Sequence, residues 1–253
     1  GAKTEVNILK SLGCTFLPNE KIEFIKYKTS IYQLYQSMIK DEFLDTYAVL
    51  EEISTDKNDS ILSNYSRDEI AEIYLFFDLD AHDNLAVKNP NCIEDMLHLF
   101  DNETENGKLY LSYPMVEAFK HPVANNKFFD IAEGKSYKTY VSTICDKKLE
   151  NFSNNAFIRE SWSISLVEHI KSTNFLLNDN QMYPTNYSDV VDIFTQYAIY
   201  QNQLRKYISQ HNNVIVLSPF ALFLIDYLGK PLFNEWKTIC ENKEVSFQNQ
   251  IGS

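Results

Sequence analysis

The first half of the chain alternates between apolar runs that are typical of strands and apolar spacings that are typical of helices. Strands are predicted where apolar runs occur, at 21–28, 72–80 and 108–112. Helices are predicted where apolar residues recur every three or four positions, at 6–12, where Gly13 is expected to end the helix, and at 30–52, 92–100 and 114–119. The continuous run at 72–80, EIYLFFDLD, is typical of a central strand that is buried on both faces.

From about residue 125 onward the pattern becomes helical. Helical spacing covers 135–150, 155–176, 188–210 and 219–228, and a strand is predicted only at 214–217. Strands that alternate with helices predict a mostly parallel sheet. The predicted fold class is therefore α/β, with a mostly parallel sheet flanked by helices over 1–124 and an all-helical C-terminal region over 125–253.

Composition agrees with a folded chain and narrows the classes of function. Of the 253 residues, 44% are apolar and 14% aromatic, which is enough for a sizeable core and excludes global disorder. The formal net charge is −12. This charge argues against a free-standing nucleic-acid coat protein, because such binding depends on Lys and Arg that neutralise phosphates.

Cysteine usage and the apolar stretches predict a cytoplasmic protein. The four cysteines are scattered without a C-x-x-C pair, which is typical of free thiols in a reducing compartment. The sequence shows no signal-peptide pattern. Its most apolar stretch, 214–229, is shorter than the roughly 20 residues that a membrane helix needs. We therefore expect no membrane contact.

The strongest candidate for chemistry is the sequence Asp78-Leu79-Asp80 at the end of an apolar run. Ligands bind at the carboxyl ends of strands in open α/β sheets, and alternation directs both carboxylates to one side. Two carboxylates this close repel each other, and a hard divalent cation such as Mg²⁺ relieves the repulsion. Asp83 adds a third acid nearby. The alternative is a group of solvated acids at a strand end.

Two further stretches place polar residues near predicted helix starts. In Ser112-Tyr113-Pro114-Met115-Val116-Glu117 an acid lies in the first turn of a helix, where the helix dipole alone also favours it. The opening Gly1-Ala2-Lys3-Thr4-Glu5 precedes a helix, as glycine turns that approach phosphate do. A glycine before a helix usually follows a strand, so we expect the sequence to begin inside a domain, after its first strand.

In this order, the three stretches resemble motifs of the Toprim nuclease domain, especially its RloB-like and OLD-family (overcoming lysogenization defect) branch, which is linked to bacterial phage defence. The opening GAKTE resembles the tail of an E-G-x-x-x-E-like sequence, whose leading glutamate would precede Gly1. Asp78-Leu79-Asp80 resembles the D-x-D motif. Ser112 to Glu117, with His121, resembles the S-x-P-x-x-E stretch of RloB-like proteins. The resemblance covers roughly the first half of the chain, and it implies that the mostly parallel sheet predicted there is Toprim-like and Rossmann-like.

The resemblance implies a metal-dependent nuclease that cleaves DNA or RNA, with tRNA among the candidate substrates. The implied catalytic residues are Glu5, Asp78, Asp80 and Glu117, and the implied ligands of Mg²⁺ or Mn²⁺ are Asp78, Asp80, Asp83 and Glu117. Contacts to the substrate phosphate are assigned to Lys3, Lys120 and His121. The resemblance also implies an ATPase partner protein, and any ATPase activity must come from that partner, because the chain has no G-x-x-x-x-G-K-[ST] sequence. A homodimer is compatible with this interpretation.

Two other classes of function remain open at this point. A haloacid-dehalogenase-like phosphatase would use Asp78 as its nucleophile, although that family has Thr or Val where this sequence has His82. A catalytically inactive module that binds and restrains another protein would account for the net charge and the incomplete motif.

Overall fold

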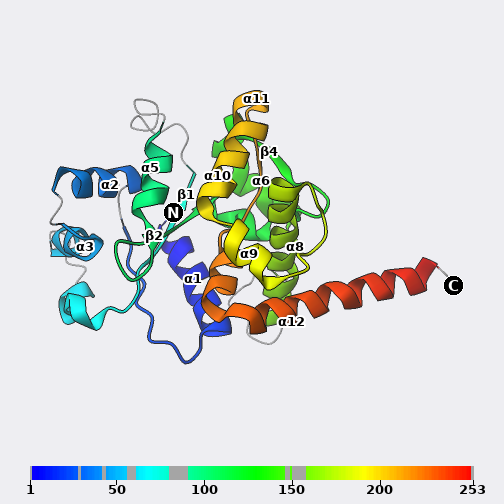
Figure 1. The fold of residues 1–253 in the computed structure, drawn as a ribbon, viewed down its shortest axis with the longest axis horizontal. Coiled ribbons are helices and arrows are strands. Elements are labelled where there is room, and N and C mark those ends of the chain that lie inside the picture. Colours follow the sequence, from blue (N-terminus) through cyan, green and yellow to red (C-terminus); the bar gives the residue numbers. More distant parts are fainter. Residues whose placement is uncertain are drawn as a thin grey trace. The chain divides into compact units, whose positions relative to one another are not determined.

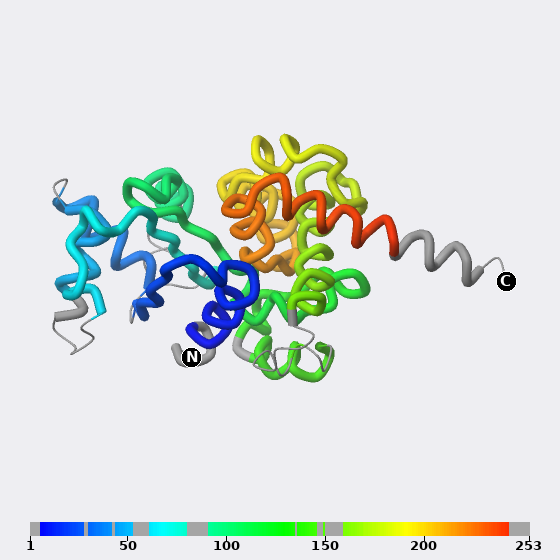
Figure 2. Tube along the Cα trace, turned by 90° about the horizontal axis from the view of Figure 1, so that it is seen from below, coloured from blue at the N-terminus to red at the C-terminus, as the bar shows by residue number. Residues whose placement is uncertain are grey.

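The computed structural model describes residues 2–27, 30–41, 44–55, 61–79, 91–145, 149 and 158–251. The chain forms two compact units, Gly1–Tyr110 and Leu111–Ser253. Figures 1 and 2 colour the chain along its sequence, so the first unit runs from blue to green and the second from green to red. The change of pattern near residue 125 lies inside the second unit, and the domain division after residue 124 stays a prediction.

Helices are the main elements among the described residues of the first unit. They are α1 (Ala2–Phe16), α2 (Ile31–Lys40), α3 (Thr46–Thr55) and α5 (Cys92–Leu99), with the 3₁₀ turns η1 (Leu62–Asn64) and η2 (Arg67–Glu69). The helix predicted at 92–100 is confirmed as α5.

Two of these helices differ from the prediction. The single helix predicted over 30–52 is divided into α2 and α3, because Asp45 accepts a hydrogen bond from the Ala48 N–H and starts a new helix. Gly13 does not end α1, which continues to Phe16. An added Cβ at Gly13 would lie 3.3 Å from the Phe24 ring, so this glycine allows a close approach of that ring instead.

A three-stranded sheet accompanies these helices (Figure 1). Its strands are β1 (Tyr74–Asp78), β2 (Asp101–Asn102) and β3 (Gly107–Ser112), in the order β1-β3-β2. The strands predicted at 72–80 and 108–112 are thereby confirmed. Among the described strands, however, the central and most buried one is β3, whereas β1 lies at an edge with only Leu75 fully buried. The central position predicted for 72–80 is therefore wrong.

The pairing of β2 with β3 also differs from the predicted parallel sheet. The two strands are antiparallel, with Asp101 opposite Lys108 and Asn102 opposite Gly107. Gly107 has a φ of 95°, which permits the tight connection between them. Residues 21–27, where a further strand was predicted, are not part of a strand, and their side chains are exposed or half-buried.

The second unit is mainly helical, as predicted. Where the structure describes this unit, its α-helices are α6 (Tyr137–Ile144), α8 (Ile158–Asn178), α9 (Tyr187–Ile193), α10 (Gln196–Gln203), α11 (Ser209–His211) and α12 (Phe220–Ile251). Its other helical turns are the 3₁₀ segments η3 (Val116–Lys120) and η4 (Ile131–Ser136) and the π-helical segment η5 (Leu204–Ile208). The helix predicted at 155–176 is confirmed as α8, and the one predicted at 114–119 is the shorter 3₁₀ segment η3.

A small sheet interrupts the helices of this unit, so it is not all-helical. Strand β4 (Phe128–Asp130) pairs with β5 (Asn213–Ile215) in antiparallel register, with Phe129 opposite Val214. The strand predicted at 214–217 corresponds to β5, whereas β4 was not predicted. After β5 the chain enters α12, which packs against α8 and is kinked at Gly229.

The interior of the second unit is large and aromatic. Trp162 on α8 is fully buried, stacks on Phe119 with ring centroids 4.6 Å apart, and meets Phe220 of α12 edge-on. The packing therefore joins η3, α8 and α12 around one core. No helix in the described ranges is long and apolar enough to cross a membrane.

Candidate functional site

Asp78 lies at the carboxyl end of β1, where the sequence pattern predicted it. The strand forms because its aromatic residues pack on both sides: the Phe76 ring stacks on Tyr110 at 5.5 Å, and Phe77 meets Tyr27 edge-on at 5.9 Å. Both distances join ring centroids. Asp78 itself is half-buried at the point where this apolar packing ends.

The other acids and the lysine predicted for the first unit are less completely described. Asp80 and Asp83 lie outside the described residues, and Lys3 and Glu5 lie in α1. Within the described ranges, no three His, Cys, Asp or Glu side chains form a group that would hold a metal ion.

Glu117 lies in η3 of the second unit and is buried. Its side chain is 7% exposed, and its Oε1 atom lies 2.7 Å from the Nζ atom of Lys138, whose side chain is 47% exposed. A buried carboxylate requires a compensating charge, and Lys138 supplies it. The sequence places the two residues 21 positions apart, and no spacing rule marked Lys138 as the partner.

His121 follows η3 and is almost completely buried. Its Nε2 atom lies 2.7 Å from the carbonyl oxygen of Asn126, and its Nδ1 atom lies 3.1 Å from the hydroxyl oxygen of Tyr137. The carbonyl oxygen can only accept, so Nε2 carries the proton and Nδ1 accepts a hydrogen bond from Tyr137. Burial lowers the pKa of His121, although the hydrogen bond to Asn126 acts in the opposite direction.

Lys120, the second lysine predicted to contact phosphate, is half-buried. Its Nζ atom lies 5.6 Å from the centroid of the Phe119 ring. The structure thus brings Glu117, Lys120 and His121 together in η3 and directly after it, whereas Asp78, Lys3 and Glu5 belong to the first unit.

A second buried histidine, His169 on α8, was not singled out from the sequence. Its Nδ1 atom accepts a hydrogen bond from the backbone N–H of Ser218 at 3.1 Å. Its Nε2 atom makes no hydrogen bond of regular geometry to any group in the described part of the chain. Burial, followed by the nearby charge of His121, lowers the pKa of His169 to about 3, although backbone hydrogen-bonding groups favour the charged form.

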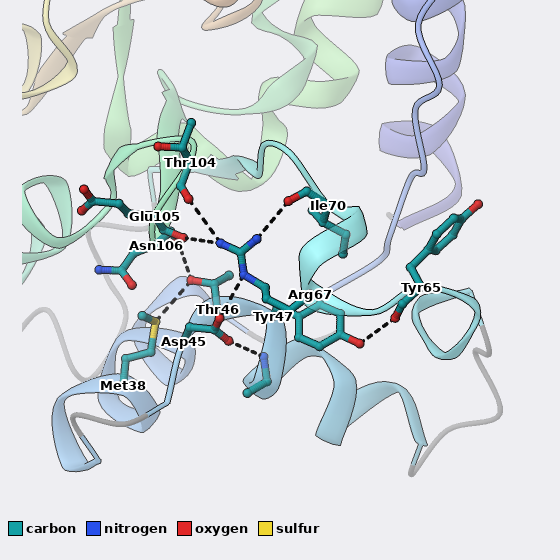
Figure 3. Close-up of polar contacts among 11 residues, drawn as sticks. Met38, Asp45, Thr46, Tyr47, Tyr65, Arg67, Ile70, Thr104, Glu105 and Asn106 are labelled. Carbon is teal, nitrogen blue, oxygen red and sulfur yellow. Dashed lines mark hydrogen bonds and ion pairs between the residues drawn. The ribbon is translucent and has the colours of Figure 1, made fainter.

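In the first unit, a polar network is centred on Arg67 (Figure 3). The guanidinium Nε atom donates to the Asp45 Oδ2 atom at 3.0 Å, directly before α3, and Nη1 donates to the Ile70 carbonyl oxygen at 2.9 Å. Nη2 donates to the carbonyl oxygens of Thr104 and Glu105, both at 3.3 Å, in the turn between β2 and β3. Arg67 therefore uses its donors internally and joins three elements of this unit.

The net charge is distributed unequally between the two units. Residues 1–110 contain 10 Lys and Arg against 21 Asp and Glu, and residues 111–253 contain 13 against 14. The first unit therefore has a formal charge of −11 and the second a formal charge of −1. A polyanionic ligand would be repelled mainly by the first unit.

Comparison with known proteins gives no relative: no protein-family model, no curated protein and no solved structure matches this chain.

Proposed function

We propose that this chain is a metal-dependent nuclease that acts as an effector of bacterial anti-phage defence together with an ATPase partner. Support comes first from β1, the apolar strand that ends at Asp78, the first acid of Asp78-Leu79-Asp80. Ligands bind at the carboxyl ends of strands in α/β folds, so a D-x-D sequence at this position is suited to chemistry. The second support for the proposal is the family resemblance, which depends on the order of the three sequence stretches.

The chemistry of the donor atoms fits a hard divalent cation. Asp78 and Asp80 offer carboxylate oxygens, which Mg²⁺ and Mn²⁺ prefer, and they would hold the ion in this proposal. When bound, such an ion polarises a phosphoryl oxygen and activates water. Glu117 fits less well, because its carboxylate is buried and already paired with Lys138.

The net charge of the first unit also supports a dependence of substrate binding on divalent cations. The first unit, which contains Asp78, has a formal charge of −11, so a phosphate group approaches it against electrostatic repulsion. A divalent cation at the acids reduces that repulsion at the point where phosphate must come closest. Binding of nucleic acid is therefore expected to be weak without divalent cations.

A panel of substrates tests the proposal. The full chain is incubated with single-stranded DNA, double-stranded DNA and tRNA, each with Mg²⁺, with Mn²⁺ or with a chelator, and with and without a candidate ATPase partner. We expect cleavage of at least one substrate that is abolished by the chelator and restored by excess metal. Cleavage that persists in the chelator would contradict metal dependence. Absence of cleavage and of Mn²⁺ binding under all conditions would favour an inactive interaction module instead.

A further inference from the structure

We infer that Glu117 and His121 are internal anchors held by the first turn of α6, and that neither binds the metal ion or the substrate. The inference rests on the proposed function for the identity of the metal ligands. It refines that function, because Asp78 and Asp80 then bind the cation without Glu117. It departs from the roles that the family resemblance implies for Glu117 and His121.

The first argument concerns the burial of Glu117. Its carboxylate is withdrawn from solvent in η3 and contacts the ammonium group of Lys138. A metal ion at this carboxylate would have to displace the ammonium group or sit beside it, and two cations at one carboxylate repel each other. No group of three potential ligand side chains surrounds Glu117 in the described part of the chain.

The second argument concerns the hydrogen bonds of His121. Both ring nitrogens are engaged, Nε2 with the Asn126 carbonyl oxygen and Nδ1 with the Tyr137 hydroxyl group. The His121 and Tyr137 rings also lie nearly parallel, at 6° and with centroids 5.8 Å apart. A histidine that donates a proton to a substrate or binds a phosphate needs an exposed nitrogen, and the His121 residue is only 2% exposed.

The third argument is that consecutive residues of α6 hold both groups. Tyr137 contacts His121, and Lys138 contacts Glu117. On its other side, η3 is fixed to α8, because the Ser165 hydroxyl group donates to the Phe119 carbonyl oxygen and the Phe119 ring stacks on Trp162. The stretch from Glu117 to His121 is therefore fixed between two helices of the second unit. This arrangement serves the packing of η3.

A double-mutant cycle tests the anchor. Glu117→Gln, Lys138→Met and the double variant are compared with the wild-type chain in thermal unfolding, in Mn²⁺ binding and in the Mn²⁺ dependence of cleavage. Glu117→Gln leaves a half-exposed ammonium group that water can solvate, and it is expected to lower the unfolding midpoint only slightly. Lys138→Met leaves the buried Glu117 carboxylate without this ion pair and is expected to lower the midpoint by about 5 °C or more. The double variant removes both charges and is expected to recover at least half of that loss. Lys171→Met, which breaks the ion pair with Glu168, is the matched control with a smaller effect, because the Glu168 side chain is 21% exposed and that of Glu117 only 7%.

The metal measurements decide between an anchor and a ligand. For an anchor, the folded double variant binds Mn²⁺ and cleaves substrate within about twofold of the wild type. A stable double variant with a tenfold loss of Mn²⁺ affinity or of cleavage rate would overturn the inference. Tighter Mn²⁺ binding by Lys138→Met would overturn it too, because either result would make Glu117 a metal ligand. If the wild type neither binds Mn²⁺ nor cleaves, the proposed function fails, whereas an absence of coupling in thermal unfolding refutes the anchor alone.

Discussion

At the scale of single residues, burial decides which polar side chains are available for chemistry. His169 is the clearest case, because α8 places it inside the second unit with the Ser218 N–H as its partner. Since Nδ1 accepts that hydrogen bond, the neutral ring carries its proton on Nε2. Protonation would place a positive charge in the buried core, so the ring stays neutral in the folded chain at neutral pH.

This burial predicts a loss of stability in mild acid. The pKa of His169 is lowered to about 3 and that of His121 is lowered in the same direction, both mainly by burial. Below about pH 6.5 the unfolded chain therefore binds protons that the folded chain does not, and the free energy of unfolding falls as the pH decreases. Between pH 7.5 and 5.5 we expect His169 to contribute a loss of about 1 kcal/mol, and His121 to contribute in the same direction.

Urea denaturation at several pH values measures this effect. His169→Asn retains an acceptor for the Ser218 N–H and removes the titrating ring, so its free energy of unfolding should depend less on pH than that of the wild type. His211→Asn is the control, because His211 is exposed on α11. Equal pH dependence in the wild type and in His169→Asn would contradict the assignment.

The sequence was informative about single residues where local pattern determines their place. Asp78 was predicted at a strand end because an apolar run precedes it, and it lies there. The partners of Glu117 and His121 were not predictable in this way. Lys138 and Tyr137 come 21 and 16 positions later in the sequence, and only the packing of α6 on η3 brings them close.

At the scale of elements, the β2–β3 hairpin depends on one glycine. Gly107 has a φ of 95°, and an added Cβ would lie 3.1 Å from the Ile73 side chain and 3.3 Å from its carbonyl oxygen. Gly107→Ala is therefore expected to reduce the free energy of unfolding by about 1–2 kcal/mol, because both the backbone conformation and the contact become unfavourable. Urea denaturation measures the change.

Gly134 provides the matched control for this substitution. It lies in η4 without a positive φ, and an added Cβ would meet no atom within 4 Å. Gly134→Ala should change the free energy of unfolding by less than about 0.5 kcal/mol. Equal effects of the two substitutions would show that the conformation of Gly107 does not limit the hairpin.

The Arg67 network predicts a second effect on the first unit. Arg67→Lys keeps the charge but loses the planar fork that reaches Asp45, Ile70 and the β2–β3 turn together. Because the Arg67 side chain is partly exposed, we expect a modest loss of about 1–2 kcal/mol in urea denaturation. Arg205→Lys is the control, since Arg205 is exposed and donates to Asn202, only three residues earlier in the sequence. A loss no larger than that of the control would refute the bracing role of Arg67.

The elements that the sequence predicted are those with strong local periodicity. Helix α8 and strands β1 and β3 were predicted close to their positions. The antiparallel hairpin was missed because the N-G signal at Asn106-Gly107 lies beside a strand, β2, of only two residues. Strand β4 was missed because its partner β5 is distant in the sequence, so its pairing depends on tertiary structure.

At the scale of the whole molecule, the net charge of −12 belongs almost entirely to residues 1–110. The sum alone argued against a nucleic-acid coat. When the net charge is divided between the units, the repulsion of phosphate falls on the unit that contains Asp78, and the second unit is nearly neutral. A nuclease with this distribution requires divalent cations for binding of its substrate as well as for chemistry.

The most direct test of the proposed function compares Asp78→Asn with Asp68→Asn in Mn²⁺-dependent cleavage by the full chain. Asp68 is an exposed acid of the same unit, in η2, so its substitution changes the net charge equally. We predict that Asp78→Asn lowers the rate of cleavage by about 100-fold or more, because it removes a proposed ligand of the catalytic ion, and that Asp68→Asn stays within about twofold of the wild type. Cleavage by Asp78→Asn at the rate of Asp68→Asn would contradict a metal site at the end of β1.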